Sequence, residues 1–369
     1  MKHSLFLVMA ACLLLAAGCS SPKNTEPADA VDQLKLKDYD PVSVFKMEEH
    51  HPTAARFSTI DMHSHVYRDT EASIREWVKT LEENNIEKVI VHTYAYGEEF
   101  DRLYDLFTGV SDKFELFCGF DMSNWDQPDF PASAVKELER CFAKGAGGVG
   151  ELSDKGMGER LSRQLREPGL HFNDPKFDAL FEKCGELGMP VVIHSGDPIW
   201  MYEPIDAHND GLMNAKHWQI DLSTPGILDL DGIVNAFVEC VERHPNTTFV
   251  ACHLLNINHD YARLGQILDT HPNMWIDISA RHQETCVTPR ATKRFYEKYQ
   301  DRILFGTDND PDPSMYHAQW RILETEDEHF YLDEQSYHWP MQGIGLSDEV
   351  LRKIYHDNAV RLLSARKIK

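Results

Sequence analysis

Short apolar runs alternate with amphipathic segments along most of this 369-residue chain. The apolar runs are continuous, as expected of strands buried on both faces, and predict strands over 58–65, 88–92, 114–120, 147–152, 190–194, 247–253, 273–278 and 302–305. The segments between them space their apolar residues for a helix and predict helices over 71–84, 98–107, 132–143, 175–187, 227–243, 261–268, 291–299 and 348–363. Long loops follow the fifth strand, over 195–226, and the eighth strand.

Eight strands that alternate with helices are typical of an α/β fold, the (β/α)₈ or TIM barrel. A doubly wound open sheet alternates in the same way, so periodicity alone does not exclude it. The polar residues at the strand ends favour the barrel, because a barrel brings the carboxyl ends of all its strands to one mouth.

Five strand ends carry residue types that bind metals. His63 and His65 are two residues apart on the first strand, so both can point to the same side and reach one point in space. The other four strand ends carry Glu151, His194, His253 and Asp308. Any one of them can be a packing or loop-capping residue, as we expect for His92 at the end of the second strand. Together they predict a metal centre.

These residues also carry a family resemblance. The segment Asp61-Met62-His63-Ser64-His65, the strand-end ligand types and Gly306-Thr307-Asp308 resemble the signature of the amidohydrolase superfamily. The resemblance is greatest to its amidohydrolase-related branch, which also contains metal-dependent decarboxylases, and it covers roughly residues 58–365.

The resemblance implies a divalent metal, with Zn²⁺ as the expected ion, held by His63, His65, His194 and Asp308. His253 would take a second metal or stabilise the reacting group. Glu151 stands where related enzymes place a bridging carboxylate or a carboxylated lysine, so one or two metals are expected. In the implied mechanism the metal activates a water, Asp308 acts as general base, and His253 or the metal stabilises the oxyanion.

Three functions are compatible with this centre. Hydrolysis of an amide, ester or lactone bond in a small molecule is the first, and the carboxylate of Glu151 favours it. Non-oxidative decarboxylation of a carboxylic acid is the second, and a lipid-tethered binding protein with an inactive barrel is the third. The complete ligand set argues against the third. For substrate binding the sequence offers Trp200 in the long loop and Arg281 after the seventh strand, which could clamp a carboxylate.

The N-terminus has a different pattern from the rest of the chain. A short charged start, an apolar run and small residues before Cys19 resemble a bacterial lipoprotein signal, with Cys19 as the acylated residue. We therefore expect a signal peptide over 1–19, a polar tether over 20–56 and the barrel over 57–369. This organisation predicts a lipid-anchored protein of the bacterial cell envelope that touches the membrane only through its N-terminal lipid.

Composition changes this picture little. The formal net charge of −23 disfavours nucleic-acid binding, because such a surface repels phosphate backbones. The eight cysteines contain no CxxC pair, so neither a zinc knuckle nor a disulfide framework is indicated. A small-molecule substrate is the expected partner, and a homo-oligomer is left open.

Overall fold

The computed structural model describes residues 28–158, 169–332 and 337–365. The predicted signal peptide and Cys19 lie outside the described residues. The chain divides into two compact units, Met1–Asp40 and Pro41–Lys369. The described part of the first unit contains a short helix, α1 (Ala28–Asp32), and a 3₁₀ turn, η1 (Leu36–Asp38). Across the described residues, no helix has the length and apolar character needed to cross a bilayer.

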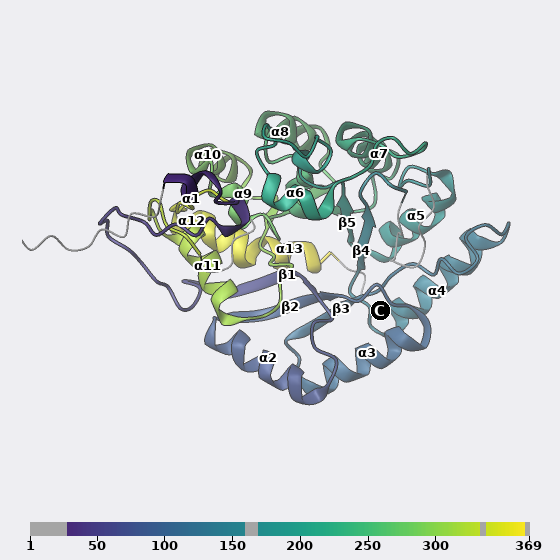
Figure 1. Cartoon of the computed structure of the whole chain (residues 1–369). Coiled ribbons are helices and arrows are strands. Elements are labelled where there is room, and N and C mark those ends of the chain that lie inside the picture. Colours follow the sequence, from purple (N-terminus) through teal and green to yellow (C-terminus); the bar gives the residue numbers. More distant parts are fainter. Residues whose placement is uncertain (1–27, 159–168, 333–336, 366–369) are drawn as a thin grey trace, which may run out of the picture. The chain divides into compact units, whose positions relative to one another are not determined.

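The second unit is a (β/α)₈ barrel, as the alternating pattern predicts (Figure 1). Its eight parallel strands are β1 (Thr59–His65), β2 (Ile86–His92), β3 (Phe114–Phe117), β4 (Val149–Asp154), β5 (Val191–Ser195), β6 (Phe249–Ala251), β7 (Met274–Asp277) and β8 (Ile303–Leu304). The strands pair in chain order within two sheets, β1-β2-β3 and β4-β5-β6-β7-β8.

Backbone hydrogen bonds join the two sheets into a closed barrel. Between β3 and β4, Gly150 N donates to Cys118 O at 2.9 Å. Between β8 and β1, Met62 N donates to Phe305 O at 2.9 Å and Asp308 N donates to His63 O at 2.8 Å. Closure therefore places the end of β8 directly beside the end of β1.

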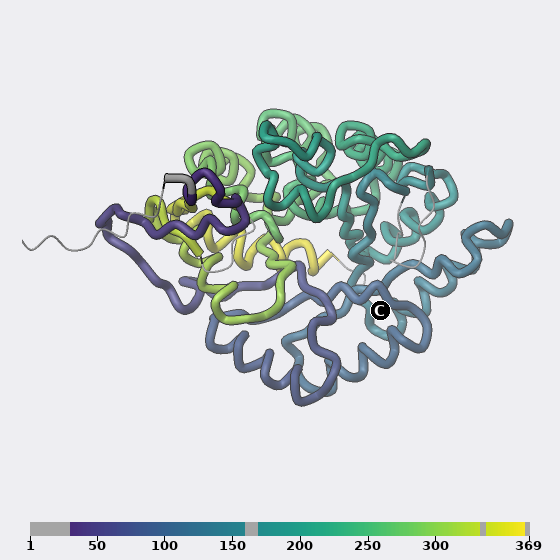
Figure 2. Tube along the Cα trace, in the orientation of Figure 1, coloured from purple at the N-terminus to yellow at the C-terminus, as the bar shows by residue number. Residues whose placement is uncertain are grey.

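Helices cover the outside of the barrel. They are α2 (Glu71–Glu83), α3 (Gly97–Val110), α4 (Phe130–Lys144), α5 (Asp178–Leu187) after a 3₁₀ turn η2 (Pro175–Phe177), α7 (Leu230–Arg243), α8 (Tyr261–Thr270), α10 (Pro289–Tyr299) and the closing series α12 (Asp348–Arg352), η5 (Lys353–Asp357) and α13 (Asn358–Leu363). Each buries one apolar face; in α2 the buried residues are Ile74, Trp77 and Leu81. The closing series, yellow in Figure 2, packs beside β1 and β8, where Phe305 N donates to Ile354 O at 3.0 Å.

The two loops predicted as long insertions also contain helices. The first holds a 3₁₀ turn, η3 (Ile199–Met201), and α6 (Leu212–Trp218), and the second holds α11 (Pro313–Glu324). A short helix, α9 (His282–Thr285), follows β7. Helix α11 begins with Asp312 as its N-cap and buries Tyr316 and Trp320, so it is a packed element of the barrel wall.

The compact unit begins at Pro41, before the predicted boundary at residue 57. The segment 41–56 has little hydrophobic periodicity, but polar contacts hold it to the end of α11 and to the residues that follow this helix. The carboxylate of Asp327 accepts hydrogen bonds from His50 N at 2.8 Å and from Arg321 Nε at 2.8 Å. Glu324 Oε1 accepts another from Arg56 N at 2.9 Å.

Candidate metal centre

The strand ends bring all six predicted metal-ligating side chains together at the barrel mouth. They are His63, His65, Glu151, His194, His253 and Asp308. Glu151 is central: its Oε1 lies 3.0 Å from His194 Nδ1, 3.3 Å from His253 Nε2 and 3.6 Å from His63 Nε2. Asp308 Oδ1 lies 2.9 Å from His65 Nε2.

The first strand delivers its two histidines after a change of register. Ile60 and Met62 belong to the apolar cluster inside the barrel, whereas His63 and His65 face the other candidate ligands. Regular alternation cannot place both sets on one side. The pairing with β2 is irregular between Asp61 and Ser64, which is where the alternation must break.

Asp277, at the end of β7, contacts the imidazole of His63 and the backbone of His253. Its Oδ2 lies 2.9 Å from His63 Nδ1, and its Oδ1 accepts a hydrogen bond from His253 N at 2.8 Å. His253 Nδ1 lies 2.9 Å from Ser279 O. These acceptors fix Nδ1 as the protonated nitrogen in both rings, so each Nε2 presents its lone pair to the centre.

The other two imidazoles are oriented by different partners. His65 Nδ1 lies 3.2 Å from the backbone oxygen of His92, so His65 also presents Nε2. His194 is turned the opposite way, with Nε2 3.1 Å from Asp197 Oδ1 and Nδ1 facing Glu151. Lys155 Nζ lies 2.9 Å from Asp197 Oδ2 and neutralises that buried carboxylate.

Electrostatics keep the carboxylates of the centre ionised. Burial opposes ionisation of Glu151, but the facing imidazoles, first among them His194, hold the pKa of Glu151 well below its usual range. Burial also raises the pKa of Asp277, but the facing imidazole of His63 outweighs burial and lowers this pKa to about 2. Burial lowers the pKa of His63, yet Asp277 and Asp308 raise it to about 10, so a metal that binds Nε2 must displace a proton from that nitrogen. The centre thus combines permanent negative charge with nitrogen donors.

A strained turn carries His253. The four residues His253–Asn256 all have left-handed backbone angles, with φ between 55° and 58°, although none is glycine. Such residues cost on the order of 1–3 kcal/mol each and persist only where other contacts hold them. Here Asn256 Nδ2 donates to Ser195 O at 3.1 Å, and Asn256 Oδ1 accepts from Arg281 Nη2 at 2.6 Å.

The donor set fits a divalent metal. Nε2 of His63 is buried and has no hydrogen-bond partner among the described residues, which is unusual for a polar atom unless it has another ligand. Two overlapping groups have donor atoms within 4.8 Å of one another, and His63 is common to both. The groups are His63, Glu151, Cys252 and His253, and His63, His65 and Asp308. Imidazole and carboxylate donors in this number suit one or two first-row cations.

A cavity of about 710 Å³ opens above the centre, and we call it the metal cavity. Glu151, His194, His253 and Asp308 line its floor, and Trp218 and other residues of the loop after β5 line its wall. Arg281 also lines it, but three of its nitrogens are engaged by Asn256 and Ala280 O. Among the described residues lining this cavity Trp200 is not found; it packs against Tyr337 and Trp339.

Several side chains that contact the candidate ligands were not predicted from the sequence. Asp277 was visible as an acid at a strand end, and Asp197 as an acid three residues after His194. Tyr94 donates to Glu151 Oε2 at 2.8 Å, and Tyr67 donates to Asp308 Oδ1 at 3.3 Å; neither has a motif that reveals it.

Comparison with known proteins agrees with this geometry. A family model described as Amidohydrolase matches residues 120–364. No curated protein sequence matches the chain. An uncharacterised TIM-barrel protein from Bordetella bronchiseptica has 14% identity and a TM-score of 0.51 over 83% of this chain and 98% of that one. A proposed amidohydrolase from Staphylococcus aureus has 13% identity and a TM-score of 0.53 over 83% and 99%. These two similarities bear on the fold.

Proposed function

The chain belongs to the amidohydrolase family, and from this premise we propose that it is a metal-dependent hydrolase of an amide, ester or lactone bond in a small molecule. The observation that carries the proposal is the convergence of four oriented imidazoles on Glu151 and Asp308, with His63 Nε2 left unpartnered among the described residues. His63, His65, Glu151, His194, His253 and Asp308 would hold one or two divalent ions, with Zn²⁺ expected. When bound, the metal supplies Lewis acidity and lowers the pKa of water toward ~7.

Asp308 is the proposed general base. Its carboxylate faces the metal cavity, and its pKa is held well below the usual range, because nearby imidazoles, first among them His63, outweigh the effect of burial. It is therefore ionised at neutral pH, as a general base must be before the attacking water gives up its proton. Tyr67 donates to the same Oδ1 and holds the carboxylate in place while it passes the proton to the leaving group.

His253 is the proposed electrophilic group for the scissile carbonyl where it does not hold a second metal. Burial and the neighbouring His194 lower the pKa of His253, so its ring is neutral. Asp277 and Ser279 fix its position at the floor of the metal cavity. Because Nδ1 donates its proton to Ser279 O, the ring can stabilise the developing oxyanion only when Nε2 also carries a proton, so this role requires a second proton on His253.

Decarboxylation uses the same type of centre and is the second candidate. Hydrolysis is favoured because Glu151 is suited to bridge two ions. Arg281, the expected clamp for a substrate carboxylate, is also engaged by Asn256 and Ala280 O.

The test is a screen of esters, lactones, amides and aromatic acids with wild type and Asp308→Asn. Asparagine keeps an oxygen near the metal but cannot take the proton, so turnover should fall by roughly 10²–10⁴-fold while most metal remains. If Asp308 only caps the loop after β8, Asp308→Asn will retain near-normal turnover, and the proposed mechanism is then wrong.

We also propose that Cys19 is acylated and anchors the protein in the bacterial envelope. The small residues before Cys19 and the polar stretch after it support this proposal.

A further inference from the structure

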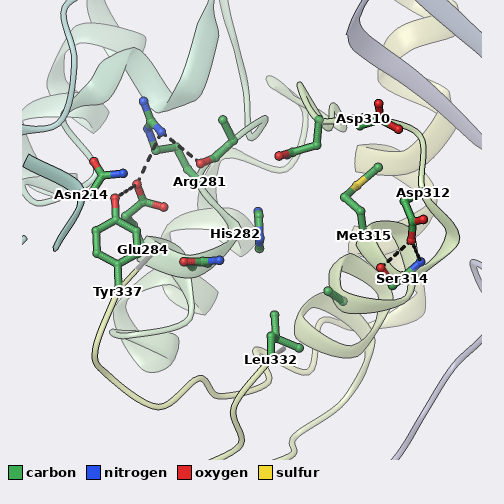
Figure 3. A pocket seen from close by; sticks show the side chains of 14 residues that line it. Asn214, Arg281, His282, Glu284, Asp310, Asp312, Ser314, Met315, Leu332 and Tyr337 are labelled. Carbon is green, nitrogen blue, oxygen red and sulfur yellow. Dashed lines mark hydrogen bonds and ion pairs between the residues drawn. The ribbon is translucent and has the colours of Figure 1, made fainter. Parts of the chain in front are cut away.

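A second cavity, of about 800 Å³, adjoins the metal cavity, and we call it the side cavity. It is lined by the segment after β7, by the start of α11 and by Tyr337 (Figure 3). Asn214, Ala280 and Arg281 line both cavities. A substrate held at the metal centre can therefore extend into the side cavity.

Glu284, on α9, contributes a buried carboxylate to the side cavity. Its Oε1 accepts a hydrogen bond from Tyr337 Oη at 2.7 Å and lies 3.5 Å from Arg281 Nη1. Its Oε2 has no hydrogen-bond partner among the described residues, although only 6% of Glu284 is exposed. Figure 3 shows this second oxygen turned away from Arg281 and Tyr337, toward the interior of the cavity. A carboxylate oxygen buried without a partner is costly, so a ligand donor placed there would be bound favourably.

His282, beside Glu284, offers a second unsatisfied atom. Its Nδ1 is buried and has no hydrogen-bond partner among the described residues. Burial lowers the pKa of His282 to about 4, so the ring is neutral and can make a hydrogen bond without adding charge. The two unsatisfied atoms therefore come from neighbouring positions on α9.

The charged groups of the side cavity point to an uncharged ligand. Asp310 is engaged by both terminal nitrogens of Arg68, at 2.9 and 2.7 Å, and Asp312 caps α11 by accepting from Ser314 N at 2.8 Å. Arg281, whose Nη1 lies 3.5 Å from Glu284 Oε1, would repel a cationic ligand placed beside Glu284. An anionic ligand would meet the carboxylate of Glu284. A hydroxyl group avoids both penalties and supplies the donor that Oε2 lacks.

We propose that the side cavity is a subsite for an uncharged, hydroxyl-bearing part of the substrate, with hydrogen bonds to Glu284 Oε2 and His282 Nδ1. The inference rests on the proposed function, because it places the scissile bond at the metal centre and the hydroxylated remainder in the side cavity. Glu284 then determines specificity without taking part in the reaction.

Binding is tested first, because it does not depend on turnover. Saturation-transfer NMR titrations compare sorbitol with 1,6-diaminohexane, two six-carbon probes that carry hydroxyls or ammonium groups. Wild type should bind sorbitol in preference to the diamine, and Glu284→Gln should weaken sorbitol binding by roughly 10- to 100-fold, the usual loss for a hydrogen bond to a charged group. The exposed Glu297 on α10 provides a control of equal charge change, and Glu297→Gln should bind as wild type does.

A second variant guards against misfolding of Glu284→Gln. Met315 lines the side cavity from α11, so Met315→Trp should fill the cavity and abolish sorbitol binding without removing a buried polar group. Sorbitol binding that is equal in wild type, Glu284→Gln and Met315→Trp would overturn the proposal. Tighter binding of the diamine than of sorbitol would overturn it as well.

Kinetics with gluconolactone and δ-valerolactone, which share a lactone bond and differ in hydroxyl groups, separate the two claims. Wild type should prefer gluconolactone, and Glu284→Gln should raise KM for gluconolactone while kcat and the hydrolysis of δ-valerolactone change little. Equal use of both lactones by wild type would contradict the subsite. If neither lactone is hydrolysed but sorbitol binding still requires Glu284, the lactonase form of the proposed function fails and the subsite is supported.

Discussion

At the scale of single residues, the positions of the candidate ligands follow from the sequence, whereas the groups that orient them do not. His194 and Asp308 are recognisable because each ends a strand in a residue type that binds metals. The role of Asp277 arises only when β7 lies between β6 and β8 and its two oxygens reach His63 and His253. No local pattern encodes a contact between residues more than 200 positions apart.

Arg281 illustrates the same limit. Its position after the seventh strand made it a candidate clamp for a substrate carboxylate, and it does line both cavities. Its guanidinium, however, donates to Asn256 and so supports the strained turn that carries His253. Sequence spacing placed the residue near the site but could not show which partner it uses.

Asp277 provides a test at this scale. In Asp277→Asn an amide N–H can face His63 Nδ1, which would force the proton onto His63 Nε2 and turn a donor toward the metal position. Metal affinity should fall by roughly 10–100-fold, as for other groups that orient metal ligands, with the fold retained. Competition with a chromophoric chelator measures the affinity. Asp112→Asn, at an exposed position before β3, is the matched control, and equal affinity in both variants would refute the assigned role.

At the scale of elements, strands and amphipathic helices follow from periodicity, but two features of the mouth do not. Helix α11 has a start signal, Asp312 followed by Pro313, and buries Tyr316 and Trp320, so its N-terminus is encoded by capping and not by periodicity. The left-handed turn at His253–Asn256 has no such signal, because leucines at its centre do not favour positive φ. Only the tertiary contacts of Asn256 account for it.

A pH-dependent contact joins the end of β4 to the segment before α5. His171 Nδ1 lies 2.7 Å from Asp154 Oδ2. Burial lowers the pKa of His171, but Asp154 raises it above the ordinary value. Because the folded-state pKa lies above the unfolded value of about 6.5, protonated His171 stabilises the fold fully below about pH 6.5. This stabilisation is lost as the pH rises through the folded-state pKa.

Replacement of His171 should therefore cost more free energy of unfolding at pH 6 than at pH 9. Chemical denaturation of wild type and His171→Gln at the two pH values measures the difference, with the exposed His208→Gln as control. A cost for His171→Gln that is the same at both pH values would show that the proton on His171 does not contribute.

At the scale of the whole molecule, the barrel is predictable because eight alternating units leave few ways to bury both faces of every strand. The start of the compact unit at Pro41 is not predictable from the sequence, because individual polar contacts, such as that of His50 with Asp327, hold the segment 41–56 in place. The proposed substrate subsite is not predictable either, because an unsatisfied atom such as Glu284 Oε2 is recognised only in three dimensions.

The proposed lipid anchor is tested by the partition of the protein between a detergent phase and an aqueous phase. Wild type with an acylated Cys19 should enter the detergent phase with the membrane fraction, whereas Cys19→Ser should be released or misprocessed. Replacement of Cys118, which is buried in the barrel, by serine is a control that should leave the partition unchanged. Wild-type protein recovered free of lipid in the periplasm would contradict the proposed anchor.

The central claim, that the barrel mouth is a metal centre, is tested most directly by elemental analysis of purified protein after exhaustive dialysis. The account predicts one to two equivalents of a divalent transition metal per chain in wild type, near two if Glu151 bridges, with one equivalent lost in Glu151→Gln. Wild-type protein that retains no transition metal, and takes up none when Zn²⁺ or Mn²⁺ is supplied, would contradict it.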